Sequence, residues 1–204
     1  MNRGLKSRSI AVAFLVSGVA LAFGGIQGSR HDFSTEAWNN EGEICRPCHT
    51  PHNAQPQIPL WNHETTVAAF MLYSSPTLEG TPEQPREGSK SCLSCHDGSV
   101  AVDSYGGNTG DNYLGGTALI GTDLSDDHPI SILWPENHWN TLDFAMCLNC
   151  HNNRPPPSFV SELPFFDGYV ECATCHDAHN GSDYEKLLRL PLQNSEICLY
   201  CHGK

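Results

Sequence analysis

Basic residues are scarce in this sequence. Its 204 residues include 11 Lys and Arg against 23 Asp and Glu, which gives a formal net charge of -12. Proteins bind nucleic acids by neutralising phosphates with Lys and Arg, so we expect no nucleic-acid partner. The acidity fits either a basic protein partner or a well-solvated surface.

Long hydrophobic runs are also scarce, and the one present covers residues 10–23, after Arg3, Lys6 and Arg8. It is shorter than the roughly 20 residues that cross a bilayer as a helix. With Ala20 and Ala22 at an A-x-A-like cleavage position, it is typical of a secretory signal peptide rather than an uncleaved anchor. We predict a signal peptide over residues 1–22, with cleavage as late as about residue 28, an exported domain over residues 23–204, and no stable membrane span after cleavage.

Two further patterns are missing. The glycine-rich stretch at 106–121 lacks the G-K-S/T ending of a phosphate loop, which disfavours nucleotide binding. No long amphipathic helix is evident, and Pro and Gly interrupt the segments between the cysteine motifs. We expect a mainly irregular coil with little β-structure, short α-helices at the cysteine motifs and another helix around residues 64–72. Since such a chain buries little apolar side chain against its ordering entropy, a large cofactor has to supply the missing core.

Cysteine is plentiful by contrast, and all ten cysteines lie in C-x-x-C-H motifs. The cysteines are Cys45 and Cys48, Cys92 and Cys95, Cys147 and Cys150, Cys172 and Cys175, and Cys198 and Cys201; the histidines that follow are His49, His96, His151, His176 and His202. This is the c-type haem attachment pattern, in which two thiols form thioethers with the haem vinyl groups and the histidine ligates iron. Disulfides, zinc sites and iron–sulfur clusters do not need a histidine after every pair.

The remaining histidines are numerous enough to fill the second axial position of every iron. The chain has 11 histidines, and the six outside the motifs are His31, His52, His63, His128, His138 and His179. Methionine is the alternative distal ligand. Met71 is conceivable for one site at most, whereas Met146 abuts Cys147 and is poorly placed.

The positions of the spare histidines differ in what they predict. His52 and His179 each follow a proximal histidine by three residues, so each points to a neighbouring haem rather than its own. His128 follows Asp126 and Asp127, one of which is expected to accept a hydrogen bond from the imidazole. His63 follows Trp61 by two residues, and an aromatic side chain at that position is suited to pack against a haem face. His31 and His138 are the weaker predictions, and one of the six is expected to be surplus.

The sequence resembles the doubled-CxxCH family of multihaem c-type cytochromes found in metal-reducing and related bacteria. The resemblance lies in the HDFS string at 31–34 and in residues 45–52, 59–63, 92–98, 126–129 and 172–202. It implies bis-histidine haems, with His52, His63, His128 and His179 at the family's additional histidine positions, and a periplasmic or extracellular location. The motif at 147–151, preceded by His138, departs from the similar tetrahaem pattern.

The sequence is compatible with three functions. We expect electron transfer through five haem c groups, with no catalytic residues, towards redox partner proteins or external electron acceptors. A homopolymer that forms an extracellular cytochrome filament is the first alternative. The second is a multihaem reductase, which needs an open iron position, and no C-x-x-C-K motif marks one.

Overall fold

The computed structural model describes residues 25–54, 58, 60–78, 80–134, 163–179 and 184–202. The predicted signal peptide, the motif at 147–151 with Cys147, Cys150 and His151, and the spare His138 lie outside these residues. Four of the five cysteine motifs therefore have a described structure. Among the described residues, no helix is long and apolar enough to cross a membrane.

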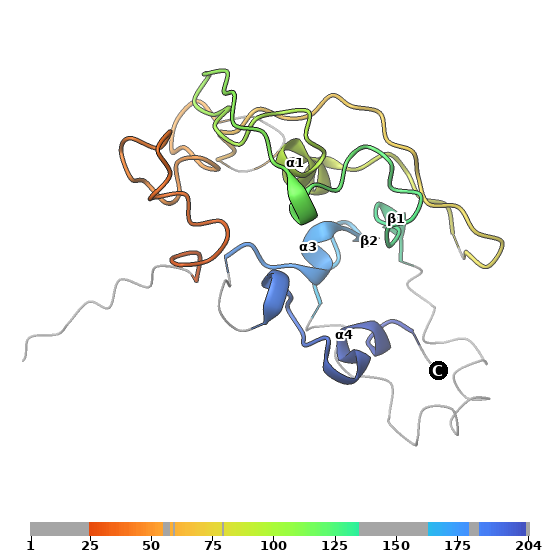
Figure 1. The fold of residues 1–204 in the computed structure, drawn as a ribbon. Coiled ribbons are helices and arrows are strands. Elements are labelled where there is room, and N and C mark those ends of the chain that lie inside the picture. Colours follow the sequence, from red (N-terminus) through yellow and green to blue (C-terminus); the bar gives the residue numbers. More distant parts are fainter. Residues whose placement is uncertain are drawn as a thin grey trace, which may run out of the picture.

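Irregular backbone dominates, as predicted, and the regular elements are short (Figure 1). The α-helices are α1 (Glu87–His96), α3 (Cys172–Cys175) and α4 (Glu196–Leu199); the 3-10 turns are η1 (Gly116–Ala118), η3 (Glu185–Leu187) and η4 (Gln193–Ser195). The strands are β1 (Ile132–Leu133) and β2 (Tyr169–Val170). Each α-helix carries at least one motif cysteine, which confirms the expected fold class.

Helix α1 carries the second motif and has well-defined ends. Glu87 in its first turn and His96 in its last turn have the charge preferences of a helix dipole. Gly98 ends the turn with φ +75°, in the left-handed region that glycine adopts readily. A Cβ at Gly98 would lie 2.7 Å from the Leu119 Cδ1 atom, so the helix end also requires close approach.

The first motif forms a single turn rather than a helix. The His49 amide donates to the Cys45 carbonyl at 2.8 Å, as in one helical turn. His49 then pairs with Trp61 in an antiparallel bridge, which takes the chain out of the helical conformation. The turn still keeps both cysteines and the histidine within one helical turn of backbone.

The helix predicted around residues 64–72 is wrong, because this segment is extended. Its amides bind side chains from other segments: the Thr66 amide donates to Ser94 Oγ at 2.9 Å, and the Phe70 amide donates to Gln84 Oε1 at 2.9 Å. The β-branched residues Thr65, Thr66 and Val67 favour this conformation. Tertiary hydrogen bonds have replaced the helical ones.

Strands β1 and β2 join parts of the chain that are distant in sequence. They pair antiparallel, with Ile132 opposite Val170 and Leu133 opposite Tyr169. The pairing places residue 131 beside the start of the fourth motif. Ser131 Oγ donates to the buried Glu171 carboxylate at 3.0 Å, and Ser89 Oγ of α1 donates to the same carboxylate.

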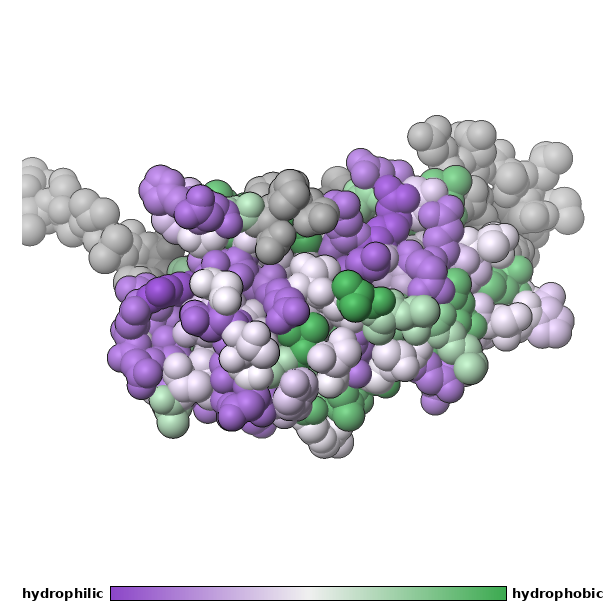
Figure 2. All heavy atoms as spheres, turned by 90° about the horizontal axis from the view of Figure 1, so that it is seen from above, coloured by the Kyte–Doolittle hydropathy of each residue, from purple (hydrophilic) through white to green (hydrophobic). Residues whose placement is uncertain are grey.

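The apolar core is small and divided. One cluster contains Leu163, Leu188, Ile197 and Tyr200, and the other contains Phe70, Leu93 and Leu124. On the face shown in Figure 2, hydrophilic residues dominate and hydrophobic ones form separate small groups. Apolar side chains alone therefore give this part of the chain a thin core, as the composition predicts.

Candidate cofactor site

Two of the described cysteines, Cys48 and Cys95, lie in environments that favour the thiol over the thiolate, whereas a hydrogen bond with Cys92 lowers the pKa of Cys172. All eight described cysteines are free of disulfides. Burial raises the pKa of Cys48 to about 11 and that of Cys95 to about 12, so both thiols are neutral near pH 7. Since bare zinc binds the thiolate, these environments disfavour it. Among the described residues, no three His, Cys, Asp or Glu side chains are grouped to hold a metal ion.

The second, fourth and fifth motifs lie next to one another. Helix α3 packs beside α1, where the Cys172 amide donates to Ser89 Oγ at 3.1 Å and the Cys92 and Cys172 thiols share a hydrogen bond. Cys175 and Cys201 pack against the same apolar cluster, which joins the fourth motif to the fifth. Figure 1 accordingly shows α3 between α1 and α4.

The first motif lies against the second. The Asn62 amide donates to the Cys48 carbonyl at 2.9 Å, and the next residue, His63, brings its Nε2 atom to 3.5 Å from Cys95 Sγ. Burial, followed by the charge at Cys48, raises the pKa of Cys95, so the two attachment sites are near enough to interact. The four described motifs form one contiguous group.

Three pairs of imidazole rings face each other across similar distances. His31 lies 6.2 Å from His96 between ring centres, with the planes at 68°. The corresponding distance is 5.9 Å for His49 and His179, with the planes at 22°. It is 6.1 Å for His128 and His202, with the planes at 71°. Each pair joins one proximal histidine to one spare histidine.

This separation matches two imidazoles on opposite sides of one metal ion. An imidazole nitrogen lies about 2 Å from a metal that it ligates. A five-membered ring with bonds of about 1.35 Å has its centre about 1.15 Å from each ring atom. Two trans imidazoles on one iron therefore have ring centres about 6.3 Å apart. The ring-centre distances of the three pairs are therefore compatible with two imidazoles that share one iron.

Backbone carbonyls orient several of these rings. Nδ1 of His96 donates to the Ala118 carbonyl at 2.7 Å, and Nδ1 of His176 donates to the Lys186 carbonyl at 2.8 Å. The His49 ring also donates to the Leu60 carbonyl. A histidine that donates from Nδ1 presents an unprotonated Nε2, which is the form that ligates a metal.

The acceptor for His128 differs from the prediction. The sequence favoured Asp126 or Asp127, but Nδ1 of His128 donates to the carbonyl of Pro129 at 3.0 Å. The carbonyl belongs to the next residue and is within reach of the ring, while Asp126 and Asp127 are exposed to solvent. A neutral carbonyl fixes the tautomer as a carboxylate would, without adding charge.

Burial lowers the pKa of three of these rings, those of His31, His49 and His128. It lowers the pKa of His31, with additional lowering by His96. Burial and then the charge of His179 lower the pKa of His49, and burial lowers that of His128. Neutral imidazole is the ligating form, so these shifts favour metal binding near pH 7.

Three predicted ligands do not form such a pair among the described residues. His63 is buried, and its two ring nitrogens lie 2.7 Å from the Glu64 carbonyl and 3.0 Å from the Ala101 carbonyl. His52 is exposed beside Thr50, and the ring of the proximal His176 bonds the Lys186 carbonyl. Ligation by His52 and His63 stays a prediction, as does ligation by His138.

Sequence reasoning missed two kinds of residue. The carbonyls of Leu60, Ala118 and Lys186 act through the backbone and leave no pattern in side-chain identity. The sequence predicts only an apolar packing contact for the Trp61 ring, but its Nε1 atom is buried and has no hydrogen-bond partner among the described residues. A large polar group brought in by a cofactor is the kind of partner that such a donor needs.

Residues 164–204, which include the fourth and fifth motifs, match a family model described as Doubled CXXCH motif. No curated protein matches the chain. The matched segment contains α3, α4 and three of the four buried residues of the apolar cluster that joins their cysteines, namely Leu188, Ile197 and Tyr200.

Proposed function

We propose, from a doubled CXXCH motif that implies a multihaem c-type cytochrome, that this chain transfers electrons through five covalently bound bis-histidine haems. The thioether bonds form at the five cysteine pairs, and the histidine after each pair is the proximal ligand. The haems supply the redox chemistry. The protein positions them, selects their axial ligands and limits access to the irons.

The three imidazole pairs are the observation that carries this proposal. Their ring centres lie 5.9, 6.2 and 6.1 Å apart, and each pair is built from residues at least 65 positions apart in sequence. An iron with two histidines is coordinatively saturated, so it passes electrons without binding a substrate. His31, His128 and His179 are then the distal ligands of the second, fifth and first haems.

The pairing of His179 with His49 supports a reciprocal link between the first and fourth motifs. His179 follows the fourth motif, yet its ring faces the proximal histidine of the first. We assign His52, which follows the first motif in the same way, to the fourth iron opposite His176. His63 and His138 remain for the third iron, whose motif lies outside the described residues.

The packing of the motifs supports a continuous electron path. The first motif lies against the second, the second against the fourth, and the fourth against the fifth. We propose that electrons enter and leave along this series towards redox partner proteins or external acceptors. The basic, apolar leader at residues 1–23 supports an exported, periplasmic or extracellular protein.

Electron paramagnetic resonance of the oxidised, haem-loaded protein tests the proposal, with the haem number taken from the intact mass. The expected result is five haems per chain and low-spin signals that account for five irons. A substantial high-spin component in undamaged protein would mean an open iron and would favour the multihaem reductase. A protein that matures in a haem-attaching host without any haem would overturn the proposal altogether.

Electron microscopy of the secreted protein separates a carrier from a filament subunit. We expect discrete particles at the concentrations at which the protein transfers electrons. Filaments with a regular repeat would instead identify the conduit as the polymer, in which the neighbouring chain extends the haem series.

A further inference from the structure

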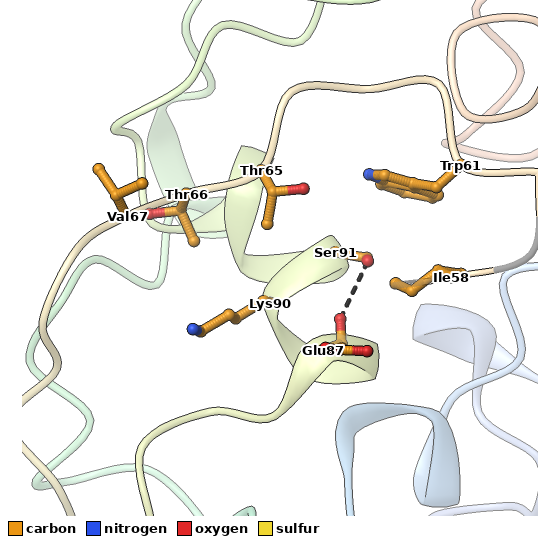
Figure 3. Close-up of a pocket in the computed structure, with 8 residues that line it drawn as sticks. All are labelled: Ile58, Trp61, Thr65, Thr66, Val67, Glu87, Lys90 and Ser91. Atoms are coloured by element: carbon orange, nitrogen blue, oxygen red, sulfur yellow. Dashed lines mark hydrogen bonds between the residues drawn. The ribbon is translucent and has the colours of Figure 1, made fainter. Parts of the chain in front are cut away.

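A cavity between residues 58–67 and helix α1 contains a buried donor that lacks a partner. The Trp61 Nε1–H has no hydrogen-bond partner among the described residues. Buried polar groups in folded proteins are nearly always paired, so this donor points to a group that binds there. The same indole lines a cavity of about 260 Å³, shown in Figure 3.

The cavity has one further free donor and one free cation. Its lining comprises Ile58, Trp61, Thr65, Thr66, Val67, Glu87, Lys90 and Ser91. Within the described chain, the Lys90 ammonium forms no ion pair and the Thr65 hydroxyl forms no hydrogen bond. Ser91 Oγ is already committed to the Glu87 carbonyl at 3.1 Å. The Trp61 and Thr65 donors lie toward each other and suit a carboxylate, which must lie away from the Glu87 side chain. The Lys90 ammonium, which points away from Trp61 in Figure 3, reaches the same group by a change of rotamer.

The position of Trp61 relative to the first motif indicates which carboxylate this is. Trp61 and His49 are partners in an antiparallel bridge, so their side chains lie on the same side of the backbone. Their ring centres are 5.9 Å apart with the planes at 84°. Because His49 is the proximal ligand in the proposed function, Trp61 flanks the haem attached at Cys45 and Cys48.

We propose that the Trp61 Nε1–H donates a hydrogen bond to a propionate of the haem attached at Cys45 and Cys48, and that Thr65 and Lys90 complete its site. This inference rests on the proposed function. Trp61 is then a positioning residue that also tunes the haem. By holding negative charge on the carboxylate away from the iron, the donors favour the ferrous state and raise the reduction potential of this haem.

The test compares Trp61→Phe with the wild-type haem-loaded protein, using the haem methyl resonances in partly reduced samples to follow each haem separately. We expect the ratio of reduced to oxidised first haem at a fixed potential to fall about threefold, from the loss of a partial positive charge near the iron. That change corresponds to about 28 mV, at 59 mV for each tenfold change. Trp38→Phe is the matched control, since its indole nitrogen is not an unpaired buried atom, and it leaves this haem unchanged.

Two further variants, at Lys90 and Thr65, test the same site independently. Lys90→Gln shifts the same haem in the same direction, and the double variant shifts it by less than the sum because both groups bind one carboxylate. Thr65→Val replaces the tryptophan variant if Trp61→Phe loses haem or fails to fold. Unchanged potentials in these variants would overturn the inference, as would a shift that appears only with added acetate or phosphate, which would mean a free anion. The number of haems and their spin state test the proposed function separately.

Discussion

At the scale of single residues, the arrangement depends on histidines that act as pairs. The HDFS string around His31 does not indicate which ring His31 faces, and its ring lies 6.2 Å from that of His96. His96 itself is fixed by two features, the C-x-x-C-H turn and the hydrogen bond from its Nδ1 to the Ala118 carbonyl. His31 therefore approaches a ring that is already oriented.

Substitution of His31 tests this pairing. His31→Ala opens one axial position, so one haem of five becomes high-spin in the electron paramagnetic resonance spectrum. His31→Met is the matched variant: it keeps the iron six-coordinate and low-spin, and a thioether in place of imidazole raises the potential of that haem. If His31→Ala stays fully low-spin, His31 is not the ligand that the ring geometry indicates.

At the scale of elements, helix α1 is the central support of the described motifs. It carries Cys92, Cys95 and His96, contacts α3 through Ser89, and forms one wall of the Trp61 cavity. Its C-terminal end depends on Gly98, whose φ is +75° and at which a Cβ atom would displace the end of the exposed Leu119 side chain. The orientation of His96 depends on that turn.

Two glycine substitutions separate this requirement from general helix propensity. Gly98→Ala is expected to destabilise the protein by roughly 1–3 kcal/mol, through strain in the left-handed region and contact with Leu119. Gly88→Ala, inside the same helix and with open space around it, is expected to stabilise by up to about 1 kcal/mol. Thermal unfolding followed in the haem absorption band measures both, and equal effects would contradict the assigned role of Gly98.

The contact between α1, α3 and β1 is centred on the Glu171 carboxylate. Burial raises the pKa of this group above its usual value of 4.5, although hydrogen bonds from Ser89 and Ser131 oppose the shift. The folded protein thus holds the proton more tightly than the unfolded chain. Its contribution to stability is present below pH 4.5 and is lost as the pH rises through the raised pKa.

Glu171→Gln removes this titration. Relative to the variant, the wild-type protein is expected to lose stability as the pH rises from about 4 to about 7, because only the wild type acquires a buried charge. Unfolding midpoints of the two proteins across this range provide the measurement. Parallel curves would show that Glu171 keeps the same protonation in the folded and unfolded states.

At the scale of the whole molecule, the haems are expected to replace the core that the polypeptide lacks. Within the part of the chain that the structure describes, the two apolar clusters contain four and three buried residues. Large apolar side chains there remain exposed, among them Val67, Leu60 and Leu199. Five macrocycles held against these surfaces would bury apolar area that the side chains cannot bury alone.

Production of the chain without haem tests this dependence. Ser in place of the ten motif cysteines, or expression in a compartment that does not attach haem, is expected to leave the chain without cooperative unfolding and sensitive to proteases. Circular dichroism and limited proteolysis of the two forms provide the comparison. A haem-free chain that unfolds cooperatively at the same temperature would show that the polypeptide core suffices.

Attachment chemistry was determined by sequence alone, because each C-x-x-C-H unit contains both thiols and the proximal histidine within five consecutive residues. The irregular fold class was also predictable from the short hydrophobic runs and frequent Pro and Gly. The helix expected at residues 64–72 was wrong, since the Thr66 and Phe70 amides bind side chains far along the chain. The hydrophobic pattern of a segment does not reveal hydrogen bonds to residues far along the chain.

Tertiary structure alone decided which histidines face each other, which carbonyls orient them and that Trp61 has an unpaired donor. The rings that face each other belong to segments at least 65 residues apart in sequence: His31 and His96, His49 and His179, and His128 and His202. The physical reason is the distance along the sequence between the residues that have to meet. Covalent attachment depends on neighbours within one turn, whereas an axial ligand must approach from the opposite side of the iron and comes from whichever segment the fold brings there.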